Sequence, residues 1–285
     1  MASDSIKLRR RITNHFFTGL SAGLSVVVVG TLVAIFAYLL IKGAGSLNWS
    51  FLTQTPKPVG EAGGGMANAL VGSIIIIAIS SLLGVPVGIA AGIYLAEYGR
   101  NRLGQLVRFT ADVLNGVPSI VIGLVAYGLV VIPQRHFSAF AGGVALAIMM
   151  VPTVTRSTEE MLLLVPHSVR EAAFGLGIPQ WRTTLSITLP SARSGIITGV
   201  MLAFARIAGE TAPLIFTAFG NQFWSLTANQ PIAALPLQIY TYALSPFEEW
   251  HRQAWAGALM LVILIVGTTT LLRFVFLRRM MGEAR

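Results

Sequence analysis

Long apolar runs recur along the chain, separated by short polar segments. Five stretches carry no charged residue and cover residues 16–41, 66–96, 113–134, 137–155 and 254–272. A sixth, from Ser194 to about Phe219, is interrupted by Arg206 and Glu210. About 20 apolar residues are needed for a helix to cross the roughly 30 Å hydrocarbon core of a bilayer. The pattern therefore predicts an all-α membrane protein with six transmembrane helices.

Composition supports this class and excludes others. Hydrophobic residues make up 54% of the chain and charged residues 11%, whereas soluble domains average about 25% charged residues. Cysteine is absent, which excludes disulfides and thiolate metal sites. The four histidines have no metal-ligand spacing, and Gly63–Gly65 lacks the Lys and Ser/Thr of a phosphate-binding loop. We expect no cofactor, no metal and no enzymatic activity, so that any ATP is handled by a partner.

The net charge of +9 is distributed unevenly between the two sides of the predicted membrane domain. If the N-terminus lies inside, outer segments hold only Lys42, Lys57, Arg135 and Arg252, and Arg206 lies within a span. All other Lys and Arg residues then fall on the inner side, which is the bias of the positive-inside rule. We expect a multi-pass membrane protein with both termini in the cytoplasm and no role in nucleic-acid binding.

Three regions follow from this topology. Residues 1–65 form the N-terminus, the first transmembrane helix and an outer loop, residues 66–273 the main transmembrane domain, and residues 274–285 a cytoplasmic tail. The first apolar run is longer than the apolar part of a signal peptide, so we interpret it as a retained anchor. In later spans, Gly84, Pro86 and Gly88 indicate either a hinge or close helix packing, and Pro118 indicates a kink.

The inner segment between residues 156 and 193 is too long and too apolar for a simple linker. Ser168 and Glu171 have the spacing of a capping box, which predicts a helix start after Pro166. Gly175 or Gly177 can supply the left-handed residue that ends this helix.

A second short helix is predicted to follow. Pro179 suits its first turn, apolar residues repeat every four positions, and Pro190 marks its end; the apolar positions are Trp181, Leu185 and Leu189. From physical chemistry alone, the two helices are either a packed connection on the membrane surface or a compact docking element.

The same segment matches the pattern EAA-x3-G-x9-I-x-LP at every defined position. Those positions are Glu171, Ala172, Ala173, Gly177, Ile187, Leu189 and Pro190. The segment resembles the signature loop of binding-protein-dependent ABC importer permeases. Further matches to that family precede it at Pro152, Arg156, Glu160 and Pro166. The resemblance covers about residues 66–273 and implies a type I ABC importer permease fold, in which this loop is a coupling-helix pair that docks on a separate ATPase.

Arg206 and Glu210 are the charged residues of the predicted fifth span. Arg206 lies 12 residues after Ser194, which places it about 18 Å along a helix, near the membrane centre. A charge there costs about 2.5–3.5 kcal/mol unless it meets a partner or a water-filled path. Glu210 is expected one turn further on the same face. The pair is either self-neutralising or part of an anion path, in which the Arg206 guanidinium binds oxyanion oxygens, Glu210 orients it, and the Thr211 hydroxyl donates.

The strings RIAGETAP, residues 206–213, and NGVPSIVIGL, residues 115–124, resemble permease subunits of the PstA type in bacterial phosphate importers. The resemblance implies an inorganic phosphate substrate and a bacterial inner-membrane location. It also implies three kinds of protein partner: a homologous PstC-type permease, two copies of an ABC ATPase, and an extracytoplasmic phosphate-binding protein. Two alternatives remain: transport of another oxyanion such as sulfate or molybdate, and a secondary transporter in which Glu210 carries coupling protons.

Overall fold

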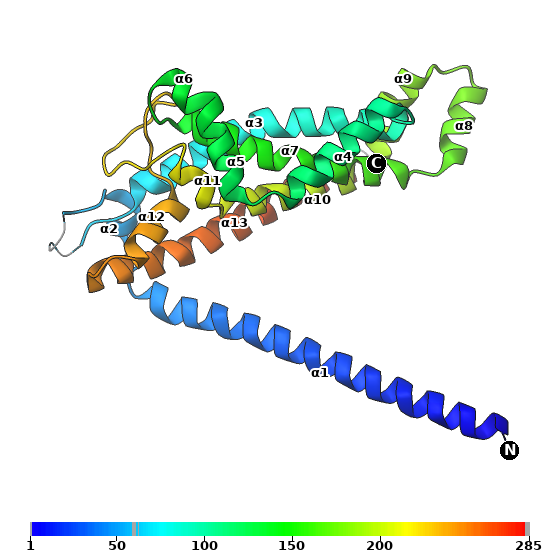
Figure 1. Ribbon diagram of the computed structural model, residues 1–285, viewed down its shortest axis with the longest axis horizontal. Coiled ribbons are helices and arrows are strands. Elements are labelled where there is room, and N and C mark those ends of the chain that lie inside the picture. The colour runs from blue at the N-terminus through cyan, green and yellow to red at the C-terminus, as the bar shows by residue number, and fades with distance from the viewer. Residues whose placement is uncertain (1, 59–60, 62, 283–285) are drawn as a thin grey trace.

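A computed structural model describes residues 2–58, 61 and 63–282, and the regular structure of this part of the chain is helical (Figure 1). The long helices are α1 (Ala2–Ala44), α3 (Ala67–Glu97), α7 (Ala139–Leu163), α10 (Leu189–Ala208) and α13 (Glu248–Gly282). The short ones are α2 (Trp49–Thr53), α4 (Arg102–Gly116), α5 (Ser119–Ala126), the π-helix η1 (Tyr127–Val131), α6 (Ile132–Gln134), α8 (His167–Gly175), α9 (Gln180–Thr183), the π-helix η2 (Thr184–Thr188), α11 (Ala212–Ile215) and α12 (Leu235–Ala243).

Five of the described helical segments are long and apolar enough to cross a membrane, and a bent pair raises the number to six if it counts as one span. The predicted all-α membrane class is therefore confirmed. Residues 274–282, predicted as a tail, continue α13, whereas Arg285 lies outside the described residues.

Helix α1 leaves the bundle formed by the other helices (Figure 1). Its contact with α13 is near its C-terminal end, where the Tyr38 and Trp255 rings lie 5.2 Å apart. A Cβ at Gly43 would lie 2.7 Å from the Trp255 carbonyl oxygen, so only glycine allows this close approach. The apolar side chains from Phe16 to Val33 are exposed along α1, as expected for a surface that meets lipid or another protein.

The tightest helix pair is α3 with α7. Gly84, Gly88 and Gly92 of α3 form one face, and Cβ atoms added to them would lie 3.1, 2.7 and 2.5 Å from side-chain atoms of α7; the α7 residues are Met150, Val154 and Thr158. Small residues let helix backbones approach each other in membranes. Helix α3 runs unbroken through Pro86. Close packing, the second of the two alternatives, explains the glycines.

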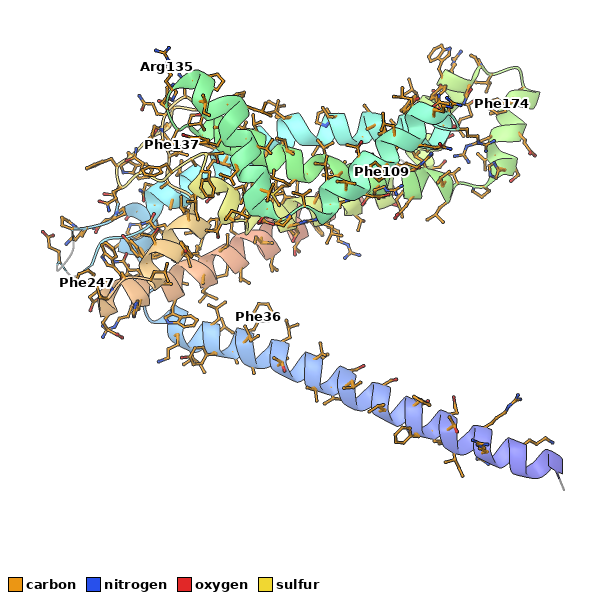
Figure 2. The ribbon with its side chains drawn as sticks, viewed as in Figure 1. Phe36, Phe109, Arg135, Phe137, Phe174 and Phe247 are labelled. Atoms are coloured by element: carbon orange, nitrogen blue, oxygen red, sulfur yellow. The ribbon has the colours of Figure 1, made fainter. Side chains whose placement is uncertain are left out.

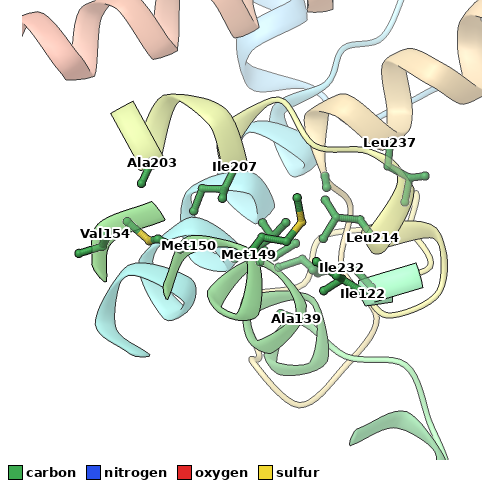
Figure 3. Packing of buried hydrophobic residues seen from close by; sticks show 14 residues of the cluster. Ile122, Ala139, Met149, Met150, Val154, Ala203, Ile207, Leu214, Ile232 and Leu237 are labelled. Atoms are coloured by element: carbon green, nitrogen blue, oxygen red, sulfur yellow. The ribbon is translucent and has the colours of Figure 1, made fainter. Parts of the chain in front are cut away.

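The main core lies where α3, α5, α7, α10, α11 and α12 meet (Figure 3). Met150 and Val154 of α7 are fully buried there, as is Ala203 of α10. Leu214 of α11 and Ile232, from the irregular segment before α12, complete the same cluster. The core therefore fixes the position of the chain that follows α10, which matters for the site described below.

The predicted span over residues 113–134 is not one continuous helix. Helix α4 ends at Gly116, Val117 has an extended backbone, and α5 starts after Pro118 at an angle of 109° to α4. The residue before a proline is disfavoured in the helical region, and the proline itself has no N–H to continue the ladder. Pro118 thus produces a full break rather than the kink that was expected.

The predicted fifth span also has different ends. Helix α10 stops at Ala208, with Gly209 as its C-cap, and Pro213 occupies the first turn of the separate helix α11. At the other end, α9, η2 and α10 form one helical segment, Gln180–Ala208, which is long and apolar enough to cross a membrane. Glycine lowers helix stability, which favours the end of α10 at Gly209. Proline is favoured in the first turn of a helix, which is consistent with the start of α11 next to Pro213.

Candidate coupling loop and substrate path

The loop between α7 and α10 projects from one end of the bundle, and Phe174 marks it in Figure 2. Helix α8 begins at His167 with Pro166 as its N-cap, and no side chain caps this end. The predicted capping box of Ser168 and Glu171 is therefore wrong. Proline is favoured at a helix start because its missing N–H would have no helical partner there. With Pro166 as the N-cap, α8 begins one residue before Ser168, so Ser168 is not the capping residue.

Gly177 ends α8 as predicted, and Gly175 stays inside the helix. The φ angle of Gly177 is +75°, in the left-handed region. The amide of Ile178 donates to the Ala173 carbonyl at 3.1 Å, and the amide of Gly177 donates to the Phe174 carbonyl at 2.9 Å. These bonds close the helix end with a left-handed glycine, which turns the chain towards α9.

The second arm of the loop does not end at Pro190, contrary to prediction. Pro190 lies in the first turn of α10, and the π-helix η2 precedes it. In η2 the amide of Leu189 donates to the carbonyl of Thr184, five residues earlier. This wider turn shifts the hydrogen-bond register just before Pro190, so the helix accommodates a residue with no N–H. The second arm of the loop and the following span are thus one continuous helical segment.

The loop presents apolar side chains on its exterior. Leu176 is 81% exposed, Trp181 60%, Leu185 54% and Phe174 47%. Of the motif residues, Ala173 is buried, Ile187 and Leu189 are half-buried, and the others are exposed, namely Glu171, Ala172, Gly177 and Pro190. A cluster of exposed apolar side chains on a protruding loop is typical of a protein-docking surface.

Sequence reasoning missed the contacts that hold this loop. Arg170 of α8 is buried and pairs with Glu97 at the C-terminal end of α3, with Nη2 3.0 Å from Oε1. Gln180 of α9 donates to the Glu97 carbonyl at 2.9 Å. The available signal was a carboxylate at the end of one apolar run and an arginine beside the motif, but a single sequence does not pair them.

A second ion-pair network joins α4 to α7. Arg156 binds Asp112 through two nitrogens and also contacts Glu159 at 3.0 Å. Arg108 contacts the other oxygen of Glu159. Glu159 is 3% exposed, whereas the neighbouring Glu160, which matched the family pattern, is exposed. The carboxylate that binds both arginines is therefore Glu159.

Arg206 occupies the last turn of α10, and its side chain is exposed. No ion pair connects it to Glu210 within the described residues. The expectation that Glu210 follows on the same helical face is wrong, because α10 ends between them. The C-terminal end of a helix carries partial negative charge, which stabilises a cation in the last turn. Glu210 and Thr211 are half-buried in the break between α10 and α11.

The helices that follow the two breaks, α5 and α11, pack on each other. A Cβ at Gly123 of α5 would lie 2.6 Å from the Cα of Pro213 in α11. The strings 115–124 and 206–213, far apart in sequence, are thus brought together by the fold. Broken helices at membrane depth are found where the irregular backbone is buried in protein or lines a path for solutes. This junction is the candidate substrate path.

Comparison with known proteins identifies the family of the chain. A protein-family model described as "Binding-protein-dependent transport system inner membrane component" matches residues 84–282. The chain is 46% identical over 271 residues to the phosphate transport system permease protein PstA of Yersinia pestis, covering 95% of this chain and 92% of that protein. It is 35% identical to PstA 1 of Mycobacterium tuberculosis, with 96% and 93% covered.

Solved structures show the same fold at low sequence identity. An inward-facing MetNI methionine ABC transporter chain superposes with a TM-score of 0.59 at 17% identity, covering 77% of this chain and 98% of that one. A chain of an amino acid ABC transporter gives a TM-score of 0.54 at 20% identity, covering 74% and 92%. With the family model matched over most of its length, the chain belongs to the binding-protein-dependent transport system inner membrane components.

Proposed function

We propose that this chain is a permease subunit of an ATP-driven importer of inorganic phosphate. The observation that carries this proposal is Arg206, which lies exposed in the last turn of α10, just before the break, and forms no ion pair within the described residues. The relatives named as phosphate transport permeases align over almost the whole chain, which supports phosphate over sulfate or molybdate. The subunit moves its substrate without covalent chemistry.

Arg206 binds the phosphate transiently on its way inward. Its planar guanidinium presents two N–H groups that match two oxyanion oxygens, and it keeps its charge at every physiological pH. Glu210 lies beyond the helix end and moderates the local positive charge, because a transport site must also release the anion. Thr211 offers a hydroxyl donor in the same break.

The loop over residues 171–190 receives the ATPase. Its exposed apolar side chains supply the docking surface, and the left-handed turn at Gly177 sets the angle between its two arms. We infer an assembly with a PstC-type permease, two ATPase copies and an extracytoplasmic phosphate-binding protein, in a bacterial inner membrane. Both termini and the docking loop then face the cytoplasm.

Replacing Arg206 with alanine tests the substrate path. In proteoliposomes holding the complete complex, we expect Arg206→Ala to abolish uptake of labelled phosphate. Leu202→Ala is the matched control, because Leu202 lies one turn earlier on the same face and is 65% exposed; its uptake should stay normal. The ATPase should co-purify with both variants.

Three results would contradict the proposal. Normal phosphate uptake by Arg206→Ala would remove Arg206 from the path. Uptake of sulfate or molybdate in preference to phosphate would correct the substrate. Uptake that persists without the ATPase and collapses with the proton gradient would favour a secondary transporter that uses Glu210.

A further inference from the structure

The C-terminal end of α3 is a point where several elements are tied together by buried polar groups. Glu97, in the last turn of α3, is 6% exposed at its side chain, and Arg170 opposite it is 11% exposed. Charged groups removed from water to this extent are stable only when paired and hydrogen-bonded. Their contacts therefore show what this end of α3 is attached to.

Arg170 joins α8 to two helices at once. Its guanidinium donates to Glu97 of α3, and also to the Val165 carbonyl at 2.6 Å and the Leu162 carbonyl at 2.8 Å. The Leu162 carbonyl lies in the last turn of α7, where a helix leaves acceptors without helical partners, and Val165 lies two residues after the end of that helix. Arg170 thus anchors the first arm of the docking loop to both helices of the tightest pair in the bundle.

Other bonds to the same end of α3 come from α9 and α4. Gln180, at the start of the second arm, donates to the Glu97 carbonyl. Arg108 of α4 donates to the Leu95 carbonyl at 2.8 Å and to the Gly99 carbonyl at 2.9 Å. Both arms of the docking loop are therefore bonded to a single residue, Glu97.

The opposite end of α3 is bonded to the loop between α11 and α12. Ser73 accepts a hydrogen bond from the Leu235 amide at 2.7 Å, and Asn68 donates to the Asn221 carbonyl, also at 2.7 Å. Between these ends α3 is one 31-residue helix, packed along its glycines on α7. A stiff helix with specific bonds at both ends is a suitable carrier of displacement.

We propose that Arg170 and Glu97 are the positioning pair through which the docked ATPase moves α3, and that α3 carries this movement to the loop Asn221–Leu235 at the far end of the bundle. The inference rests on the proposed docking of an ATPase at residues 171–190. It adds a defined connection from that loop to the opposite side of the protein.

The absence of cysteine allows a direct test. A single Gln222→Cys in the far loop, where Gln222 is exposed, reports the movement as a labelling rate with a soluble maleimide. The purified permease–ATPase complex is labelled with and without ATP. We expect ATP to change the labelling rate of the single variant Gln222→Cys. This ATP-dependent change should be lost when Arg170→Met or Glu97→Gln is added, while the ATPase remains bound.

Two features make the result decisive. Glu97→Gln leaves Arg170 bonded to the Leu162 and Val165 carbonyls. It therefore tests the connection between α8 and α3 even if Arg170→Met does not fold. Arg102→Met is the matched control, since Arg102 is an exposed arginine at the start of α4 with no described partner; it should keep the full ATP-dependent change. The double variant should lose no more of the labelling change than Arg170→Met alone, because Arg170→Met already removes the contact that Glu97→Gln removes.

The inference is overturned if ATP changes the labelling fully in both pair variants, or not at all in Gln222→Cys alone. Loss of the ATPase from both variants would also overturn it, because the pair would then belong to docking. Phosphate uptake by the same variants in proteoliposomes separates the two proposals. An ATP-dependent labelling change without phosphate uptake would contradict phosphate as the substrate but would leave the proposed connection through Arg170, Glu97 and α3 in place.

Discussion

Two adjacent carboxylates on α7 have opposite environments. Glu159 is buried and contacts Arg108 and Arg156, whereas Glu160 is exposed. Residues one position apart on a helix point about 100° away from each other, so only one of them can face α4. Matching to a family pattern selected Glu160, because a pattern of letters contains no information about which side of the helix is covered.

Neutralising these two residues should therefore have different effects on stability. Glu159→Gln leaves two arginines without their shared counter-charge, and removal of one partner of a buried pair is costly. Both arginine side chains are about 30% exposed, so solvent reduces the penalty, and we expect a loss of about 2 kcal/mol. Glu160→Gln should change stability by less than about 0.5 kcal/mol. Thermal unfolding in detergent measures both, and equal melting temperatures would contradict the burial of Glu159.

At the same scale, the motif residues were predictable and their partners were not. The left-handed turn at Gly177 follows from glycine's backbone freedom, which is a local property. The pairing of Arg170 with Glu97 joins residues 73 positions apart, and it depends on how α3 and α8 are placed in space. Sequence therefore located the two short helices of this loop but not the residues that hold them.

At the scale of elements, the glycine face of α3 predicts where added volume is not tolerated. A Cβ at Gly92 would lie 2.5 Å from the Thr158 Cβ, whereas nothing lies within 4 Å of one at Gly30 in α1. We expect Gly92→Val to destabilise the chain by about 1–3 kcal/mol through overpacking, and Gly30→Val to be nearly neutral. Denaturant or thermal unfolding of the purified chain compares the two, and similar losses would show that α3 and α7 are not in close contact.

The helix lengths were predicted well for α3 and α13 and poorly for the two spans that break, after Gly116 and after Ala208. Helices α3 and α13 cover the apolar runs predicted for them, because hydrophobic length alone determines a simple span. The break at Pro118 lies inside a charge-free apolar run, so hydrophobicity does not reveal it; the break at Gly209 lies between Arg206 and Glu210, which were interpreted as residues of one continuous helix. Pro190 shows the reverse case: a proline that stays within a helix because a π-helical turn precedes it.

For the whole molecule, the charge distribution predicts an orientation that can be measured. Arg135 and Arg102 are both exposed, at the opposite ends of the segment formed by α4, α5 and α6. In intact cells, an impermeant maleimide should label Arg135→Cys readily and Arg102→Cys only after the membrane is permeabilised. Labelling of Arg102→Cys in intact cells would reverse the assigned orientation. The cysteine-free sequence supplies the background control.

The class of the molecule was accessible from sequence, and the course of its substrate path was not. Apolar length and charge bias gave the membrane class and an expected orientation. The candidate path depends on α5 and α11, which follow breaks in two different spans, being packed together through Gly123 and Pro213. Such a junction is created by tertiary packing, which a one-dimensional pattern of apolar residues does not contain.

The π-helix η2 sets the relative orientation, around the helix axis, of the proposed docking loop and the proposed substrate path. Trp181 and Arg206 lie on one continuous helical segment, Gln180–Ala208, so their relative direction around its axis depends on the number of residues between them. Deleting one residue from Thr184–Thr188 would rotate Trp181 by about 100° relative to Arg206. The number of residues between Trp181 and Arg206 thus determines how the two side chains are rotated relative to each other about the helix axis. A deletion in η2 is therefore expected to disturb their relative placement more than a substitution of any single side chain in η2.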